Sequence, residues 1–270
     1  MSSGRMHARS EDGAHLEVSV YGDGPPLLLI PGLGSTRSVF DPIVPSLQRL
    51  RRVIVYDPRG VGDSDAGTRP FTMPLLAGDA EAVLDATTTP QADVFGASMG
   101  GVVAQQLAVT SPQRVRRLIL AATTPGGEHA VPADPRATAA LLGKGARTPA
   151  DAYRLACTVL YSTHFQRTHP EFIDEQVRIR AAHPVRGRVF TAQLQALREA
   201  SGIWEHLREV HTQVLVMHGT ADAVIPFENA RLLAARVPGA RTRWFEQCGH
   251  LFFHERPEES ARVIDEFLRD

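Results

Sequence analysis

The sequence predicts an α/β protein in which a mostly parallel central sheet is flanked by helices and interrupted by one helical insertion. Three observations support this prediction. Short β-type runs alternate with stretches of helical periodicity along the chain. Most of these runs are continuously apolar, as strands buried on both faces of a parallel sheet are. A long segment, from Gly126 to Arg208, contains helical stretches but no convincing strand.

The β-type runs define the expected sheet. The first, at 15–21 (HLEVSVY), alternates apolar and polar residues as a half-buried strand does. Five later runs are more continuously apolar and are expected to form inner strands, at 25–30, 52–57, 92–97, 116–122 and 213–219. Apolar residues at helical spacing predict helices between strands, at 72–87, 100–112 and 227–238. A last helix is expected from Pro257, because proline and the two glutamates after it suit a first helical turn.

The insertion consists of helical stretches separated by proline and glycine, without an internal repeat. These stretches lie at 135–143, 149–162, 170–182 and 190–207. A separate helical domain is the alternative, but an apparent strand on each side favours a cap on one sheet. We therefore expect a core formed by residues 1–125 and 209–270, and a helical cap formed by residues 126–208.

Composition narrows the classes of function. The 270 residues are 43% hydrophobic and 22% charged, which is typical of a globular protein. The formal net charge is -1 and there is no long block of like charge, so we expect neither a nucleic-acid nor a membrane partner. Two cysteines, Cys157 and Cys248, are too few for a disulfide framework, and none is expected. The N-terminus lacks the apolar stretch of a signal peptide, which predicts a cytoplasmic protein, whereas its oligomeric state is left open.

Residues 94–101 (VFGASMGG) place three glycines around Ser98, directly after a predicted strand. The pattern G-x-S-x-G at 96–100 is typical of the sharp strand-to-helix turn that exposes a nucleophilic serine. A helix N-terminus at this point would also favour developing negative charge. An unreactive serine in a crossover of small residues is the alternative interpretation.

A serine hydroxyl needs a base to take its proton and an acid to orient that base. Asp222 follows the predicted strand at 213–219, and His250 follows a further β-type run just before the last helix. The chain order serine, aspartate, histidine is the one that accompanies this type of serine turn. Because each residue follows a predicted strand, all three are expected at the carboxyl edge of the sheet, where open α/β sheets bind ligands.

Five motifs in this order resemble the α/β-hydrolase superfamily, in its capped, single-domain branch of esterases, lactonases and haloperoxidase-like enzymes. They are PGLGS, DPRGVGDSD, GASMGG, HGTADAVIP and CGH, and the resemblance covers nearly the whole chain outside the cap. It implies that Ser98 is the nucleophile, that His250 is the general base and then acid, and that Asp222 orients it. In the second motif we expect Asp57 and Arg59 to tie the glycine-rich turn.

The resemblance also implies an oxyanion hole formed by the backbone N–H groups of Leu33 and Met99. Pro31 stands where the family usually has a histidine. Because the donor that the hole needs belongs to Leu33, we expect the hole to be retained. What changes is the side-chain network that the histidine usually anchors.

These residues predict a serine hydrolase that cleaves a carboxylic ester or lactone through an acyl-enzyme, without a metal or organic cofactor. The same residues leave open the hydrolysis of a diketone C–C bond or a thioester, and acyl transfer. A repurposed enzyme such as a cyclase, or a non-catalytic ligand receptor, is the alternative from another class. The expected substrate is a small ester, lactone or diketone.

Aromatic residues of the cap are candidate walls of the substrate pocket, with ordinary helix packing as the alternative for each. They are Tyr161, Phe165, Phe190 and Trp204. Two further histidines compete with His250 for a functional role. His218, at a strand end, is expected to be a structural hydrogen-bonding residue. His254 lies four residues after His250, but no H-E-x-x-H or supporting ligand pattern accompanies it, so no metal site is predicted.

Overall fold

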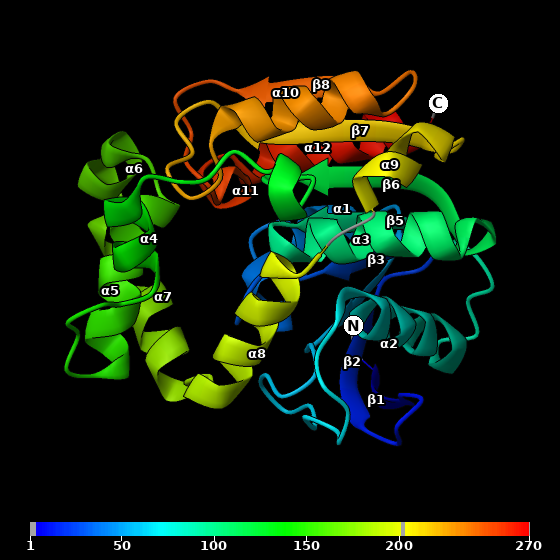
Figure 1. The fold of residues 1–270 in the computed structure, drawn as a ribbon, viewed down its shortest axis with the longest axis horizontal. Helices are drawn as coiled ribbons and strands as arrows, with labels where there is room; N and C mark the ends of the chain where they lie inside the picture. Colours follow the sequence, from blue (N-terminus) through cyan, green and yellow to red (C-terminus); the bar gives the residue numbers. More distant parts are fainter. Residues whose placement is uncertain (1–3, 201–202, 270) are drawn as a thin grey trace.

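The computed structural model describes residues 4–200 and 203–269. An eight-stranded sheet runs through it in the order β1-β2-β4-β3-β5-β6-β7-β8 (Figure 1). The strands are β1 (Gly4–Arg9), β2 (His15–Tyr21), β3 (Pro26–Ile30), β4 (Arg52–Tyr56), β5 (Ala92–Ala97), β6 (Val115–Ala121), β7 (Gln213–Gly219) and β8 (Arg241–Phe245). Strand β2 pairs antiparallel with β1 and β4, and every other pair is parallel. The predicted mostly parallel sheet is confirmed.

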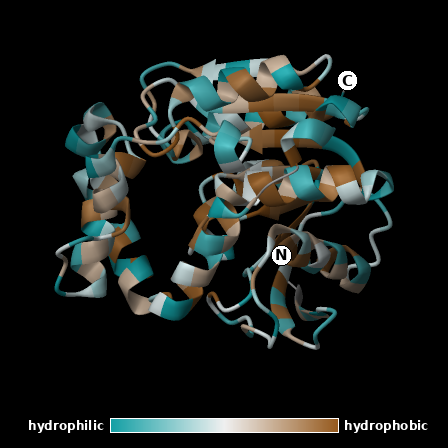
Figure 2. Ribbon diagram, viewed as in Figure 1, coloured by the Kyte–Doolittle hydropathy of each residue, from teal (hydrophilic) through white to brown (hydrophobic). Residues whose placement is uncertain are grey.

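Helices flank this sheet on both faces. Those outside the insertion are η1 (Arg37–Phe40), α1 (Val44–Leu47), α2 (Met73–Ala86), α3 (Met99–Thr110), η2 (Pro112–Arg114), α10 (Phe227–Arg236), α11 (Phe252–Glu255) and α12 (Pro257–Arg269). Consecutive strand residues point to opposite faces, so each strand supplies both layers. On one face Leu28 and Val94 pack with α2, α3 and α10. On the other, Leu27 and Phe95 pack with α1 and α12. The strands are coloured mainly hydrophobic in Figure 2, as double-sided burial requires.

The described residues between β6 and β7 form helices and no strand. They are η3 (Gly127–His129), α4 (Pro135–Leu141), α5 (Pro149–Leu160), α6 (Thr163–Thr168), α7 (Pro170–Ala182), α8 (Gly187–Arg198), α9 (Ile203–His206) and η4 (Leu207–Glu209). Helices α4 to α7 stand beyond one end of the strands, and α8 leads back toward the sheet (Figure 1). Helices α4, α5 and α7 begin at the prolines that open the predicted stretches. Thr148, for example, caps α5 by accepting from the Asp151 N–H at 3.1 Å, with Pro149 in the first turn.

The insertion shares its apolar packing with the rest of the chain. Leu160 and Phe165 belong to the same buried cluster as Phe253, a residue of α11. The Leu251 N–H also donates to the Leu160 carbonyl at 3.0 Å. The C-terminal end of α5 is therefore fixed against the loop that carries His250. The division of the chain into a core and a cap at residues 126 and 208 stays a prediction.

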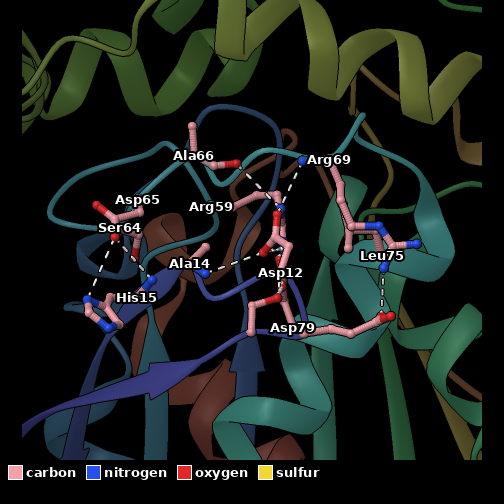
Figure 3. A network of polar contacts seen from close by, with 12 residues as sticks. Asp12, Ala14, His15, Arg59, Ser64, Asp65, Ala66, Arg69, Leu75 and Asp79 are labelled. Atoms are coloured by element: carbon pink, nitrogen blue, oxygen red, sulfur yellow. Dashed lines mark hydrogen bonds and ion pairs between the residues drawn. The ribbon is translucent and has the colours of Figure 1, made fainter.

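A buried cation holds the antiparallel edge of the sheet against α2. Arg59 is fully buried, and its guanidinium donates to both carboxylate oxygens of Asp79 at 2.6 Å (Figure 3). It also pairs with Asp12, in the β1–β2 turn, at 3.2 Å. Asp57 instead ties the turn after β4, as expected, because it accepts from the Asp63 N–H at 3.1 Å. Arg59 was predicted to tie the local turn, but its ion pairs join that turn to α2 and to the β1–β2 turn.

Candidate active site

Ser98 lies between β5 and α3 in a conformation that few residues other than glycine adopt. Its backbone has φ 55° and ψ -122°, and such a strained residue persists only where its surroundings hold it. Here the Ser98 N–H donates to the Ala121 carbonyl at 2.9 Å, and the Thr123 hydroxyl donates to the Ser98 carbonyl at 2.7 Å. The strain therefore falls on the serine that the sequence singled out.

The glycines around Ser98 allow three backbone segments to meet. A Cβ atom on Gly96 would lie 2.3 Å from the Gly100 carbonyl oxygen. A Cβ atom on Gly100 would lie 2.1 Å from the Ile30 carbonyl oxygen, at the end of β3. Neither position has space for any side chain. The end of β3 and the start of α3 can approach each other only because both residues are glycine.

Asp222 and His250 are joined by a buried hydrogen bond. The His250 Nδ1 atom lies 2.8 Å from Asp222 Oδ2. Asp222 follows β7 and His250 follows β8, and the two turns touch, since a Cβ atom on Gly219 would lie 2.2 Å from the Gly249 carbonyl oxygen. The other carboxylate oxygen of Asp222 accepts from the N–H groups of Val224 at 2.8 Å and Ile225 at 2.9 Å. The structure thus brings together the acid and the base that the sequence predicted.

The surroundings of Asp222 favour its ionised form. Burial alone would raise the pKa of the carboxyl group. The charge and hydrogen bond of His250 and the hydrogen bond of His218 lower the pKa by more than burial raises it, so the pKa lies below its usual range. A carboxylate at this position accepts the Nδ1 proton of His250. The Nε2 atom of a neutral imidazole is then left with a free lone pair, as a general base requires.

His218 touches the same carboxylate, a contact that sequence reasoning missed. Its Nε2 atom lies 2.9 Å from the Ile225 carbonyl and 3.1 Å from Asp222 Oδ2, and the ring is fully buried. The expected structural role agrees with the bond to Ile225. The i, i+4 spacing of His218 and Asp222 across a strand end was the available signal for the second contact.

Ser98, His250 and Leu33 line one cavity of about 530 Å³. The walls are mainly apolar and come largely from the insertion, through Leu141, Leu142, Ala152, Ala156, Leu160, Val185, Phe190, Leu194 and Leu197. A concave, mostly apolar site with a few convergent polar groups is the usual form of a small-molecule site.

The two residues predicted to form the oxyanion hole flank Ser98. Met99 is the first residue of α3. Leu33 follows Gly32, on which a Cβ atom would lie 3.0 Å from the Ser98 Cβ. A residue of the insertion fixes the peptide group that follows Leu33: the Gly34 N–H donates to the buried side-chain oxygen of Gln193 at 2.8 Å. Sequence reasoning gave no indication of Gln193, which lies in a stretch of α8 without any motif.

Comparison with known proteins agrees with this geometry. Residues 25–257 match the family model described as alpha/beta hydrolase fold. The chain belongs to this family.

Individual relatives of this α/β hydrolase differ in their reactions. The chain is 34% identical to a poly(3-hydroxyalkanoate) depolymerase from Ectopseudomonas oleovorans, over 90% of this chain and 84% of the relative. It is 30% identical to a 2-hydroxymuconate semialdehyde hydrolase from Pseudomonas putida, over 96% of this chain and 92% of the relative. Among solved structures, the enol-lactonase from Burkholderia xenovorans LB400 superimposes with a TM-score of 0.85 at 22% identity, covering 98% of this chain and 100% of that one. The last likeness shows the fold.

The four aromatic residues predicted to line the pocket divide into one cavity residue and three packing residues. Phe190 lines the cavity, but Tyr161, Phe165 and Trp204 do not, which corrects the prediction for these three. The Tyr161 hydroxyl lies 2.9 Å from His254 Nδ1, and the Phe165 ring stacks on Tyr161 with centroids 5.5 Å apart. Trp204 stacks on His129 at 4.7 Å. Each of these three rings packs against or bonds to a neighbouring side chain and is not part of the cavity lining.

His254 is a buried structural residue of the hydrolase. Its Nε2 atom lies 2.6 Å from the Val39 carbonyl, and burial lowers its pKa to about 4. Both cysteines are buried and unpaired, and burial raises the pKa of Cys157 to about 12 and that of Cys248 to about 11. Within residues 4–200 and 203–269, no three His, Cys, Asp or Glu side chains gather as a metal site requires, and no helix is long and apolar enough to cross a bilayer.

Proposed function

We propose that this α/β hydrolase cleaves a carboxylic ester or lactone through a covalent acyl-enzyme. The observation that supports this most is the buried bond of 2.8 Å between His250 and Asp222, on a histidine that lines the same cavity as Ser98. An ionised carboxylate on Nδ1 holds the imidazole in the tautomer that can accept the Ser98 proton. A serine that is strained, lies at a helix N-terminus and shares its cavity with such a histidine matches an activated nucleophile.

In the proposed reaction the Ser98 oxygen attacks the substrate carbonyl as its proton moves to His250 Nε2. The N–H groups of Leu33 and Met99 donate to the oxyanion of the tetrahedral intermediate. This intermediate collapses, the bond to the alcohol oxygen breaks, and His250 returns the proton to the leaving alcohol. Water then attacks the acyl-enzyme with His250 again as base, and the acid is released. For a lactone, the leaving alcohol stays attached to the acid as a hydroxy acid.

The cavity walls favour a substrate with an apolar body. Leucine, valine and alanine side chains dominate the surface that faces Ser98 and His250. Burying apolar area there stabilises the bound substrate by roughly 25 cal/mol per Å². The similarity to a poly(3-hydroxyalkanoate) depolymerase, at 34% identity, supports the choice of a carboxylic ester as the substrate.

Hydrolysis of a C–C bond is the second candidate, because the Pseudomonas putida relative, 30% identical over 96% of this chain, is a semialdehyde hydrolase. The two reactions need the same serine and histidine but different leaving groups. Incubation with a p-nitrophenyl ester and with a vinylogous 1,5-diketone separates them: ester turnover without diketone cleavage supports the esterase, and the reverse result replaces it.

The test of the shared machinery is a double-mutant cycle on Ser98→Ala and His250→Ala. If both residues act as one unit, each single variant loses nearly all turnover of a p-nitrophenyl ester or small lactone, and the double variant is scarcely worse. Labelling by a fluorophosphonate should likewise require Ser98. Circular dichroism checks that the variants fold. Additive losses, or labelling of the Ser98→Ala variant at the wild-type rate, would refute a shared mechanism.

A further inference from the structure

Arg180, on α7, is an isolated charge in the apolar cavity. Among the described residues, it is the only Arg, Lys, Asp or Glu side chain in the cavity lining. The cavity also holds Ser98 and His250. A cation in such a place lowers the affinity for a purely apolar ligand, because its desolvation has to be compensated.

No carboxylate within the described part of the chain neutralises Arg180. Its guanidinium donates to the Gly34 carbonyl and lies over the Tyr153 ring, 5.5 Å from the ring centroid. The half-buried Arg180 differs in this from the two buried arginines: Arg59 pairs with Asp12 and Asp79, and Arg51 pairs with Asp93 and Asp265. Burial accordingly lowers the pKa of Arg180, although an arginine stays charged. One carbonyl uses only part of the five N–H donors of a guanidinium.

A small pocket with several polar side chains in its lining adjoins the cavity at this arginine. It has a volume of about 40 Å³, which is room for a small polar group. Besides Arg180, its polar lining comprises Ser35, Thr36, Ser38, Gln176 and His183. Arg180, Ser35, Val39 and Tyr153 line both the pocket and the catalytic cavity. A molecule bound at Ser98 therefore has apolar walls along its body and meets the Arg180 guanidinium on the side where α7 faces the loop after β3.

We propose that Arg180 binds an ionised carboxylate of the substrate, with the hydroxyls of the adjoining pocket completing the site. The substrate class is then an ester or lactone that carries a second, free carboxyl group, separated from the scissile bond by an apolar chain. This inference rests on the proposed esterase function and adds its specificity. Carboxylate matches the planar guanidinium because two parallel N–H···O bonds can form. A neutral group would leave the charge uncompensated.

The test compares two esters that differ only in charge. Mono-p-nitrophenyl adipate is an anion at pH 7, and its methyl ester is a neutral analogue of nearly the same shape. The wild type should have the higher kcat/KM for the anion. Arg180→Gln should lower the ratio of the two kcat/KM values by about 10- to 100-fold, mainly through KM, which is the scale of a hydrogen bond to a charged group. Arg180→Lys keeps the positive charge but cannot form two parallel hydrogen bonds, so its ratio of kcat/KM values should lie between those of the wild type and Arg180→Gln.

Arg178 provides the matched control, two residues earlier on the same helix. Its side chain is 71% exposed and pairs with Glu175, so Arg178→Gln should leave the ratio unchanged. Equal losses on both esters in Arg180→Gln would mean that the residue acts only through Gly34, and would overturn the proposal. So would a wild type without preference for the anion. Circular dichroism checks folding, and Arg180→Lys decides if the glutamine variant does not fold.

A binding measurement separates failure of this proposal from failure of the esterase function. Ser98→Ala is titrated calorimetrically with monomethyl adipate and with dimethyl adipate. Tighter binding of the anion that is lost on adding Arg180→Gln supports the carboxylate site, even if the wild type hydrolyses neither p-nitrophenyl ester. Equal affinity for both ligands would reject it, whatever the hydrolysis rates are.

Discussion

Replacing Asp222 by asparagine tests the proposed mechanism at one atom. Oδ1 of Asp222 accepts from the N–H groups of Val224 and Ile225 at 2.8 and 2.9 Å. The amide NH₂ of an asparagine cannot occupy that side, because it would face two donors. The amide oxygen must stay there, and the NH₂ must take the place of Oδ2, which lies 2.8 Å from His250 Nδ1.

This orientation reverses the role of the imidazole. The NH₂ donates to His250 Nδ1, so the ring proton moves to Nε2, the nitrogen that the mechanism needs as an acceptor. The corresponding substitution in serine proteases lowers kcat by about 10⁴, which equals roughly 5.4 kcal/mol of transition-state stabilisation. His218 adds a second conflict, because its Nε2 atom, 3.1 Å from Oδ2, also faces the new NH₂. We expect the free energy of unfolding to fall by about 1–3 kcal/mol, the cost of an unsatisfied buried donor.

The assay is turnover of a p-nitrophenyl ester by wild type and Asp222→Asn, with urea unfolding followed by circular dichroism. The expected result is a folded protein with kcat reduced by about 10⁴ and KM little changed. The chain neighbours of Asp222 are Ala221 and Ala223, so no carboxylate can take over by a shift of one residue. Turnover within about tenfold of the wild type would refute the reasoning and point to another group that orients His250.

Three further predictions concern stability. Burial lowers the pKa of His254 to about 4 from 6.5, so the stability that the neutral ring provides is present above pH 6.5 and lost as pH falls toward 4. The difference in unfolding free energy between wild type and His254→Gln should shrink by about 3 kcal/mol from pH 7 to pH 4, and a constant difference would contradict this. Gly100→Ala should abolish folding or activity, since its Cβ atom would lie 2.1 Å from a backbone oxygen. Gly78→Ala in α2 is the control, because a Cβ atom there has nothing within 4 Å, and it should be neutral or stabilising by up to about 1 kcal/mol in thermal unfolding. Equal effects of the two substitutions would refute the steric argument. Arg59→Leu should lower the unfolding free energy by about 3–5 kcal/mol, because two buried carboxylates lose their partner. Arg262→Leu, which removes an exposed ion pair, should lower it by less than about 0.5 kcal/mol. Similar losses for both variants in denaturant unfolding would refute this prediction.

The inner strands could be predicted because burial on both faces leaves a continuous apolar run that few other structures need. The run at 92–97 is an example, and it forms β5. Strand β1 was not predicted, since only Met6 and Ala8 among its six residues are clearly apolar. It is an edge strand held by backbone pairing with β2, and backbone hydrogen bonds leave no trace in residue type.

The site divides in the same way. Chemistry that depends on residue identity was visible: Ser98 lies at a strained turn, and Asp222 meets His250. Contacts that depend on how helices fold back were not visible. Tyr161 and Trp204 looked like pocket walls because large aromatic rings suit both a cavity and a core, and only tertiary packing decides between them.

The helices between β6 and β7 contact the site on two sides, which bears on what they contribute. Gln193 accepts from the Gly34 N–H, beside the loop proposed to hold the oxyanion. On the other side, Glu255 accepts from the N–H groups of Gly249 at 2.9 Å and Ser162 at 2.7 Å, next to His250. Both loops of the proposed site are therefore hydrogen-bonded to the insertion or to residues that bind it. The sequence of the insertion thus sets the position of the proposed catalytic groups as well as the shape of the cavity. Substitutions in the insertion that change substrate specificity are therefore expected to alter kcat together with KM.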